Sequence, residues 1–235
     1  MTAPILITGV GKRVGFYLAK ALAQQGQKVI GTYRSHYPQL NELEALGVEL
    51  HACDFYDDRQ LTSLIANLQQ HPVFKAIIHN ASDWLPDGDP ASAIAIMDQM
   101  MRIHVSVPYT INLALTTQLK AYTGSTANII HITDYVVDKG SKKHAAYAAS
   151  KAALHNLTLS FAAKLAPNVK VNSIAPAMLM FNPSDDEQYQ QKTLKKALLQ
   201  KEGGEIEILN AVTYLLQSQY MTGQVLKVDG GRHLT

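Results

Sequence analysis

The sequence of 235 residues contains a single cysteine, Cys53, so the chain cannot form an internal disulfide. A fold without disulfides is typical of a reducing compartment. The sequence has no run of about 18 uninterrupted apolar residues, which argues against a membrane-spanning helix. Its first residues, MTAPILITGVGKR, place no basic segment ahead of a long apolar core and predict no secretory signal. We therefore expect a cytoplasmic protein.

Neither sign of charge dominates the sequence. Lysine and arginine number 21 and aspartate and glutamate 19, which leaves a net charge of +2 and argues against nucleic acid or a membrane surface as a partner. Hydrophobic residues make up 47% and charged residues 17%, enough apolar material for a full core. The length fits one α/β domain spanning 1–235.

Short apolar runs alternate with amphipathic stretches along the whole chain. This pattern is typical of βαβ units, whose right-handed crossovers build a doubly wound parallel sheet with helices on both faces. The predicted strands are 4–8, 28–33, 48–53, 74–79, 128–133, 169–174 and 224–228. The predicted helices are 13–25, 39–46, 59–70, 91–120, 144–165 and 205–217.

One irregular stretch, 177–204, interrupts this alternation. After Ala177 the stretch has four hydrophobic residues, MLMF, and then many Asp, Gln and Lys residues. A loop of this length in a compact domain is usually functional, so we expect a substrate lid, with a solvated helical insertion as the alternative. Met178 and Phe181 would then either cover the ligand or pack beneath the loop.

A glycine-rich turn follows the first predicted strand and precedes the first helix. It reads Thr8-Gly9-Val10-Gly11-Lys12-Arg13-Val14-Gly15. Glycines in such a turn let backbone N–H groups approach a pyrophosphate at a helix N-terminus. The spacing departs from GxGxxG, so a purely structural turn remains an alternative.

The second predicted strand ends in GTYRSHY, without the acid that binds the ribose 2′-hydroxyl in NAD sites. Arg34 and Ser35 stand there instead, and a guanidinium with a hydroxyl suits a 2′-phosphate. The sequence therefore predicts NADP rather than NAD as the cofactor, unless Arg34 is a simple surface arginine.

Tyr147 and Lys151 are four positions apart in the helix predicted over 144–165, so they share one face. A nearby ammonium stabilises a phenolate, which lowers the tyrosine pKa and makes the phenol a usable acid near neutral pH.

These features occur together with other motifs in a characteristic order. They are TGxxxxxG after the first strand, Asn80-Ala81-Ser82 after the fourth, YAASK on the long helix, NSIAP after the sixth strand and VDGG near the end. The chain resembles the short-chain dehydrogenase/reductase family from about Ile5 to Arg232. That resemblance implies a single Rossmann-type domain, a homodimer or homotetramer, and hydride transfer to or from NAD(P). The cofactor-binding residues it implies are Gly9, Gly11, Lys12, Arg13, Val14, Gly15, Arg34, Ser35, Asp54, Asn80, Ala81, Ser82, Lys151 and Pro176.

Three departures from the common family pattern resemble the pteridine reductases. Arg13 replaces a turn glycine, and Asp134, 13 positions before Tyr147, stands where the catalytic serine is usual. Trp84 lies where those enzymes place an aromatic ring over the pterin. The resemblance implies NADPH-dependent reduction of a dihydropterin, with 7,8-dihydromonapterin favoured and weak activity on dihydrofolate.

The chemistry of these residues agrees with that substrate class. A carboxylate at Asp134 would repel the alkoxide formed from a ketone, whereas it can deliver or relay the proton that a reduced C=N bond requires. The indole of Trp84 can stack on a flat heteroaromatic ring. We expect Tyr147, Lys151 and Asp134 to be catalytic, and Trp84, Asp134, Tyr147, Met178 and Phe181 to bind substrate. A turn aspartate and a structural tryptophan are the simpler alternatives.

Histidine stands at one position where the family has another residue. The family usually has asparagine in its central helix to hold a water of the proton relay, and the register places His104 there, a residue that can also donate, accept or relay a proton. His79, His131 and His144 form no spaced metal cluster and suggest structural or surface roles. A reductase of another carbonyl or imine, such as a 3-oxoacyl chain, and a non-catalytic NADPH sensor or scaffold are the alternative functions; Asp134 disfavours the first and the Tyr147–Lys151 pair the second.

Overall fold

The computed structural model describes residues 3–235 as one α/β domain built on a seven-stranded parallel sheet. The strands lie in the order β3-β2-β1-β4-β5-β6-β7. Their bounds are Ile5–Ile7 (β1), Val29–Tyr33 (β2), Glu49–Ala52 (β3), Ala76–His79 (β4), Ala127–Ile132 (β5), Val169–Pro176 (β6) and Val225–Val228 (β7). The predicted doubly wound sheet is confirmed.

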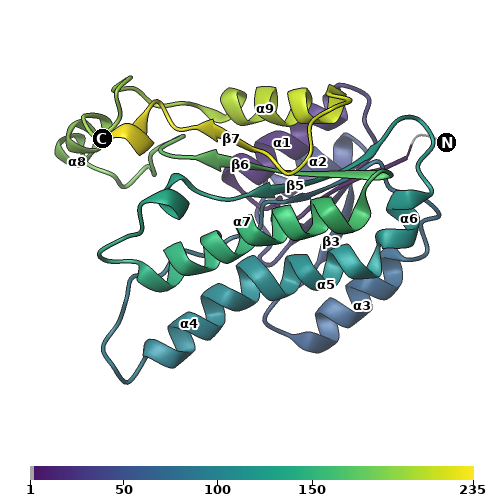
Figure 1. Ribbon diagram of the computed structural model, residues 1–235, viewed down its shortest axis with the longest axis horizontal. Helices are drawn as coiled ribbons and strands as arrows, with labels where there is room; N and C mark the ends of the chain where they lie inside the picture. Colours follow the sequence, from purple (N-terminus) through teal and green to yellow (C-terminus); the bar gives the residue numbers. More distant parts are fainter. Residues whose placement is uncertain (1–2) are drawn as a thin grey trace.

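Helices cover both faces of the sheet (Figure 1). Helices α1, α2 and α9 lie on one face, and α3, α4, α5 and α7 on the other. The helices are Arg13–Gln24 (α1), Leu40–Ala45 (α2), Asp58–Leu68 (α3), Ala93–Met101 (α4), Val107–Ala114 (α5), Thr116–Lys120 (α6), Ala145–Leu165 (α7), Glu187–Leu194 (α8) and Glu205–Gln217 (α9). None of the helices within residues 3–235 is long and apolar enough to cross a membrane.

Strand β1 shows how the sequence builds two cores from one sheet. Successive side chains of a strand point to opposite faces. Ile5 and Ile7 pack with Leu18 and Leu22 of α1, whereas Leu6 packs on the other face in the cluster that contains Phe74. All of these side chains are buried, because a parallel sheet is covered on both faces.

The helical stretch predicted over 91–120 is not one regular helix. Helices α4 and α5 are joined by a π-helical segment, Arg102–Ser106, and α6 follows after a short break. π-Helical turns inside α-helices are rare and occur frequently at functional sites. Here the segment brings His104 against the loop that follows β4.

The irregular stretch predicted over 177–204 contains one helix, α8, between extended segments. Figure 1 shows α8 beside the C-terminus, beyond the ends of the sheet strands. Gly203 and Gly204 donate backbone hydrogen bonds to Met178 and Leu179, so the stretch begins and ends at the same place. Such closely spaced ends are typical of a compact loop with its own packing.

A row of hydrogen-bonded polar side chains lies inside the core. It includes His79 and His131, which agrees with the structural roles predicted for these histidines. His79 Nε2 lies 2.8 Å from Asn112 Oδ1, and Asn112 Nδ2 lies 3.3 Å from His131 Nε2. His131 Nδ1 in turn lies 2.8 Å from the Thr158 hydroxyl. Burial lowers the pKa of His79 to about 4, so both buried imidazoles are neutral near pH 7.

Candidate active site

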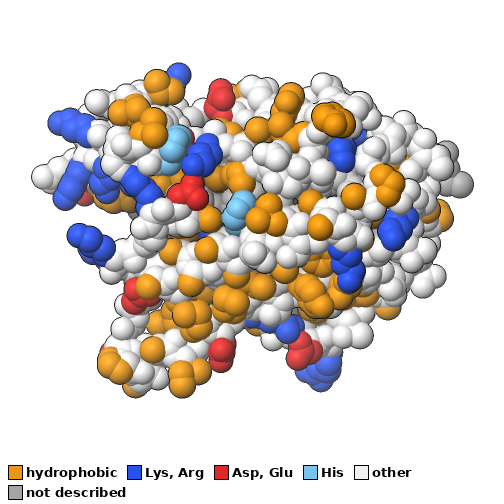
Figure 2. Space-filling view, in the orientation of Figure 1, with side chains coloured by type: hydrophobic (Ala, Val, Ile, Leu, Met, Phe, Trp, Pro, Cys, Tyr) orange, Lys and Arg blue, Asp and Glu red, His pale blue; other side chains and the backbone are white. Residues whose placement is uncertain are grey.

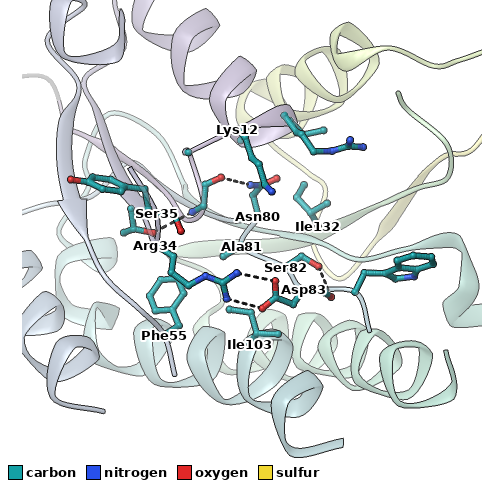
Figure 3. A pocket seen from close by; sticks show the side chains of 18 of the residues that line it. Lys12, Arg34, Ser35, Phe55, Asn80, Ala81, Ser82, Asp83, Ile103 and Ile132 are labelled. Carbon is teal, nitrogen blue, oxygen red and sulfur yellow. Dashed lines mark hydrogen bonds and ion pairs between the residues drawn. The ribbon is translucent and has the colours of Figure 1, made fainter. Parts of the chain in front are cut away.

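A cleft opens at the carboxyl ends of β1, β2, β4 and β5, where the order of the strands reverses (Figure 3). Ligands of open α/β sheets bind at this switch point. The predicted residues that line the cleft are Gly9, Gly11, Lys12, Arg13, Val14, Gly15, Arg34, Ser35, Asp54, Asn80, Ala81, Ser82, Trp84, Asp134, Tyr147, Lys151 and Pro176. Met178 and Phe181 do not line it, whereas Leu179 between them does.

The glycine turn leaves no room for side chains at two positions. Gly9 has φ +75°, and a Cβ there would lie 2.8 Å from the Ala81 Cα. At Gly15 a Cβ would lie 2.1 Å from the Gly9 carbonyl oxygen. Asn80 holds the turn by donating from Nδ2 to the carbonyl oxygens of Thr8 at 3.1 Å and Gly9 at 3.0 Å.

Helix α1 begins at Arg13, within this turn, without a side-chain cap. The first N–H groups of a helix have no partner within it, and an anion can satisfy them. The turn therefore fits the pyrophosphate of a dinucleotide, as the sequence predicts.

Arg34 reaches into the cleft from the end of β2, but its guanidinium is not free. It donates to both carboxylate oxygens of Asp83, at 2.9 and 3.4 Å (Figure 3). The Tyr56 hydroxyl donates to the same carboxylate at 2.8 Å. The hydrogen bond to Asp83 raises the pKa of Arg34. Sequence reasoning missed Asp83, and the only available signal was its position directly after the Asn80-Ala81-Ser82 motif.

Tyr147, Asp134 and Lys151 meet in the cleft. The Tyr147 hydroxyl donates to Asp134 Oδ2 at 2.8 Å, and the backbone N–H of Val136 donates to Oδ1 at 2.9 Å. Lys151 is buried, and its Nζ donates to the Ile132 carbonyl oxygen at 2.9 Å. Burial lowers the pKa of Lys151 to about 8 and raises the pKa of Asp134.

The tyrosine does not respond to its surroundings as the sequence suggests. Burial, and then the charge of Asp134, raise the pKa of Tyr147 well above its usual value. The Lys151 ammonium lies 5.7 Å from the centre of the phenol ring and is engaged with the backbone, so it does not offset these effects. The arrangement therefore holds the phenol as a neutral donor against a carboxylate whose own proton affinity is increased.

Trp84 lines the cleft and is 62% exposed. Its indole stacks on the imidazole of His144, with ring centres 3.9 Å apart and planes inclined by 23°. His144 Nδ1 lies 2.9 Å from the Leu85 carbonyl oxygen, which holds the imidazole in place. One face of the indole is thus covered by the protein, while much of the side chain remains accessible to a flat ligand.

Arg13 joins the glycine turn to the beginning of the 177–204 stretch. It adopts φ +54°, a left-handed conformation that non-glycine residues rarely adopt. Its guanidinium bonds to the Asn182 side chain and to the Met180 carbonyl oxygen at 3.3 Å. The arginine that replaces the usual family glycine therefore contacts the predicted lid as well as the cleft.

Residues 3–235 hold no group of three or more His, Cys, Asp or Glu side chains that could bind a metal ion. The cleft instead brings together a glycine turn at a helix N-terminus, the two arginines Arg13 and Arg34, and a phenol–carboxylate pair.

Comparisons with known proteins agree with this geometry. The family model described as Enoyl-(Acyl carrier protein) reductase, which belongs to the short-chain dehydrogenases/reductases, matches residues 9–233. The chain is 48% identical to dihydromonapterin reductase of Klebsiella pneumoniae over 232 residues, which cover 98% of this chain and 97% of that protein. It is 47% identical to dihydromonapterin reductase of Escherichia coli, with the same coverage.

Solved structures show the same architecture. FolM alternative dihydrofolate reductase 1 of Brucella canis, crystallised with NADP, superposes with a TM-score of 0.87 at 25% identity and covers 99% of this chain and 94% of that one. With the motifs, the strand order and these matches in agreement, the chain belongs to the short-chain dehydrogenase/reductase family.

Proposed function

We propose that this protein is an NADPH-dependent reductase of dihydropterins whose main substrate is 7,8-dihydromonapterin and which acts weakly on dihydrofolate. The observation that carries the proposal is the hydrogen bond from Tyr147 to Asp134, at the position where ordinary carbonyl reductases of the family have a serine. Relatives that match along the full length are named dihydromonapterin reductases, and the Brucella canis relative binds NADP. The first names support the substrate class, and the second supports the cofactor.

The cleft fits the cofactor. We assign its pyrophosphate to the glycine turn from Gly9 to Gly15, where any side chain at these two glycines would meet backbone or Asn80. Arg34 and Ser35 would take the 2′-phosphate, for which the Arg34 guanidinium would have to share or give up its bonds to Asp83, and Lys151 would hold the nicotinamide ribose. The bound cofactor supplies the hydride that the reduction requires.

The chain's own groups then manage the proton. Reduction of a C=N bond leaves a nitrogen that must be protonated, and the Tyr147 hydroxyl is a donor held in the cleft. As its proton leaves, a protonated Asp134 could return one to the phenol oxygen across the 2.8 Å contact, and the hydrogen bond would then run from Asp134 to Tyr147; burial raises the pKa of Asp134 toward that form. A serine in place of Asp134 could not return a proton to the phenol oxygen in this way.

An assay of NADPH oxidation tests the proposal directly. We expect loss of NADPH absorbance with 7,8-dihydromonapterin, a slower loss with dihydrofolate, and none with simple ketones or 3-oxoacyl chains. Reduction of ketones without reduction of dihydropterins would overturn the proposal. Binding of NADPH without turnover of any of these compounds would instead favour a sensor or scaffold.

Cofactor preference depends on Arg34 in this proposal. We expect NADPH to bind at least about tenfold more tightly than NADH, since one charge-assisted contact contributes about 1.5–3 kcal/mol. Arg34→Ala should remove most of that preference, whereas Arg59→Ala, an exposed arginine paired with Asp57 outside the cleft, should leave it unchanged. Titrations by protein fluorescence measure both affinities, and equal affinities in the unmodified protein would contradict this role of Arg34.

Substrate recognition separates into two measurable effects. Trp84→Ala should raise KM by about five- to thirtyfold, because stacking and burial of about 1–2 kcal/mol act in ground and transition states alike.

Asp134→Ser should instead lower kcat, because proton supply matters in the chemical step. Steady-state kinetics with dihydromonapterin distinguish the two, and a KM effect alone in Asp134→Ser would remove Asp134 from the proton path.

The assembly is part of the proposal, because the exposed apolar residues of α4, α5 and α7 suggest a subunit interface. Figure 2, in the orientation of Figure 1, shows hydrophobic side chains gathered over the region of these helices. The exposed apolar residues of the three helices are Ile94, Met97, Tyr109, Leu113 and Leu159, which are 78, 41, 48, 37 and 43% exposed. Contiguous apolar surface of this kind marks protein contacts. We expect a homodimer or homotetramer by light scattering at micromolar concentration, and a monomer would contradict this.

We also assign a lid role to 177–204. Leu179 of this stretch lines the cleft, and Arg13 ties Met180 and Asn182 to the glycine turn. The domain as a whole, 1–235, then serves as one NADP-binding unit with its own cover.

A further inference from the structure

His104 occupies the π-helical segment between α4 and α5 and is 1% exposed. Its Nε2 lies 2.8 Å from the Ser82 hydroxyl oxygen, and its Nδ1 lies 2.8 Å from the Ser150 hydroxyl oxygen. Its ring meets the Tyr147 ring edge to face, with centres 5.4 Å apart. The imidazole therefore connects the loop after β4, which lines the cleft, with the turn of α7 that carries Tyr147.

The position of the imidazole proton follows from Ser150. The Ser150 hydroxyl donates to the backbone carbonyl oxygen of Tyr147 at 2.7 Å, and a hydroxyl has only one proton to give. If Ser150 donated to His104 instead, two acceptor oxygens would face each other at that distance. Nδ1 of His104 must therefore carry a proton and donate it to Ser150.

The imidazole is also neutral. Its burial, and then the nearby charge of Lys151, lower the pKa of His104 to about 2, so only one of its nitrogens is protonated at any working pH. With Nδ1 protonated, Nε2 is a bare acceptor, and the Ser82 hydroxyl must donate to it. A donation from Ser82 to the Asp83 carbonyl oxygen, 3.3 Å away, would leave two lone pairs opposed across 2.8 Å.

We infer that His104 is a positioning residue, fixed as the Nδ1–H tautomer, that directs the proton of Ser82 away from the cleft and so makes Ser82 a hydrogen-bond acceptor toward bound ligand. Ser82 lines the cleft. Its oxygen then favours ligands that present N–H donors there. NADP⁺ carries such groups on its adenine and carboxamide and, if the proposed function holds, a dihydropterin carries them on its amino group and ring. A neutral imidazole of this kind orients the serine hydroxyl without carrying a charge near pH 7.

The tautomer can be measured without any ligand. Long-range ¹H–¹⁵N correlation spectra of the labelled protein should show one histidine protonated on Nδ1 and bare on Nε2, and His104→Asn identifies it by loss of the signal. Its ¹⁵N shifts should stay constant from about pH 6 to pH 9, whereas an ordinary exposed histidine titrates near 6.5. A proton on Nε2, or titration in this range, would overturn the inference.

Variants test the link to Ser82. His104→Leu and Ser82→Ala should each weaken NADP⁺ binding by about tenfold, the effect of one buried hydrogen bond, and the double variant should be no weaker than either alone. His104→Asn keeps one donor and one acceptor, so it should stay within about threefold of the unmodified protein. Losses that multiply in the double variant, or an asparagine variant no better than leucine, would contradict the coupling.

These measurements separate the inference from the proposed function. Thermal unfolding of each variant shows whether it folds, and should His104→Leu not fold, the tautomer and the Ser82→Ala and His104→Asn variants still decide the question. If the protein does not reduce dihydropterins, the proposed function fails while the tautomer and the coupling in NADP⁺ binding remain testable. If dihydropterins are reduced but Nε2 carries the proton, the inference alone fails.

Discussion

Tyr147→Phe should lower the turnover of dihydropterin by at least about 10²-fold while leaving NADPH binding nearly unchanged. General acids typically contribute 10²–10⁴-fold to a rate, and the Tyr147 hydroxyl is the donor held against Asp134 in the cleft. The substitution removes one oxygen and keeps the ring, which retains its contact with His104 and its place in the buried cluster. Steady-state kinetics give kcat, and fluorescence titration gives the NADPH affinity.

A matched control is available on the protein surface. Tyr214→Phe removes a hydroxyl from a half-exposed tyrosine of α9 outside the cleft and should leave both quantities unchanged. Full activity in Tyr147→Phe would show that the proton reaches the substrate from another group, with Asp134 first in line. That outcome would be checked by Asp134→Asn, which keeps the shape of the side chain but removes its acid.

Gly15→Ala should abolish most cofactor binding and destabilise the fold. A Cβ at this position would lie 2.1 Å from the Gly9 carbonyl oxygen and 2.4 Å from Asn80 Nδ2. The first turn of α1 would therefore have to move away from Gly9 and Asn80. Overpacking of this kind typically costs about 1–3 kcal/mol, which lowers the melting temperature of a domain of this size by several degrees. We expect the NADPH affinity to fall by more than about tenfold, because the displaced N–H groups no longer converge on the pyrophosphate.

Gly47→Ala separates the two consequences. Gly47 has φ +76°, so an alanine there is strained, but a Cβ would meet nothing within 4 Å and the residue lies outside the cleft. This variant should lose stability by about 1 kcal/mol and keep its NADPH affinity. An unchanged NADPH affinity in Gly15→Ala would mean that the glycine turn does not hold the pyrophosphate.

Local sequence patterns were enough to predict the framework of the protein. Apolar runs with flanking helical periodicity predicted the parallel sheet, because burial on both faces leaves a local pattern in each strand. We could predict the turn from Gly9 to Gly15 and the shared face of Tyr147 and Lys151, because the residues of one turn or one helix have fixed relative positions. The role of Asp134 was predicted from its sequence separation from Tyr147, and in the structure the two side chains are hydrogen-bonded at 2.8 Å.

How these groups are held and charged depends on contacts between segments that lie far apart in the sequence. Asp83 is 49 positions from Arg34, and Leu85 is 59 positions from His144, so no local pattern announces either contact. The sequence suggests that Lys151 lowers the pKa of Tyr147, but burial and Asp134 raise it, because both effects depend on which groups fold around the phenol. The proton on His104 likewise follows from Ser82 and Ser150, which come from two other elements and meet only in the folded chain.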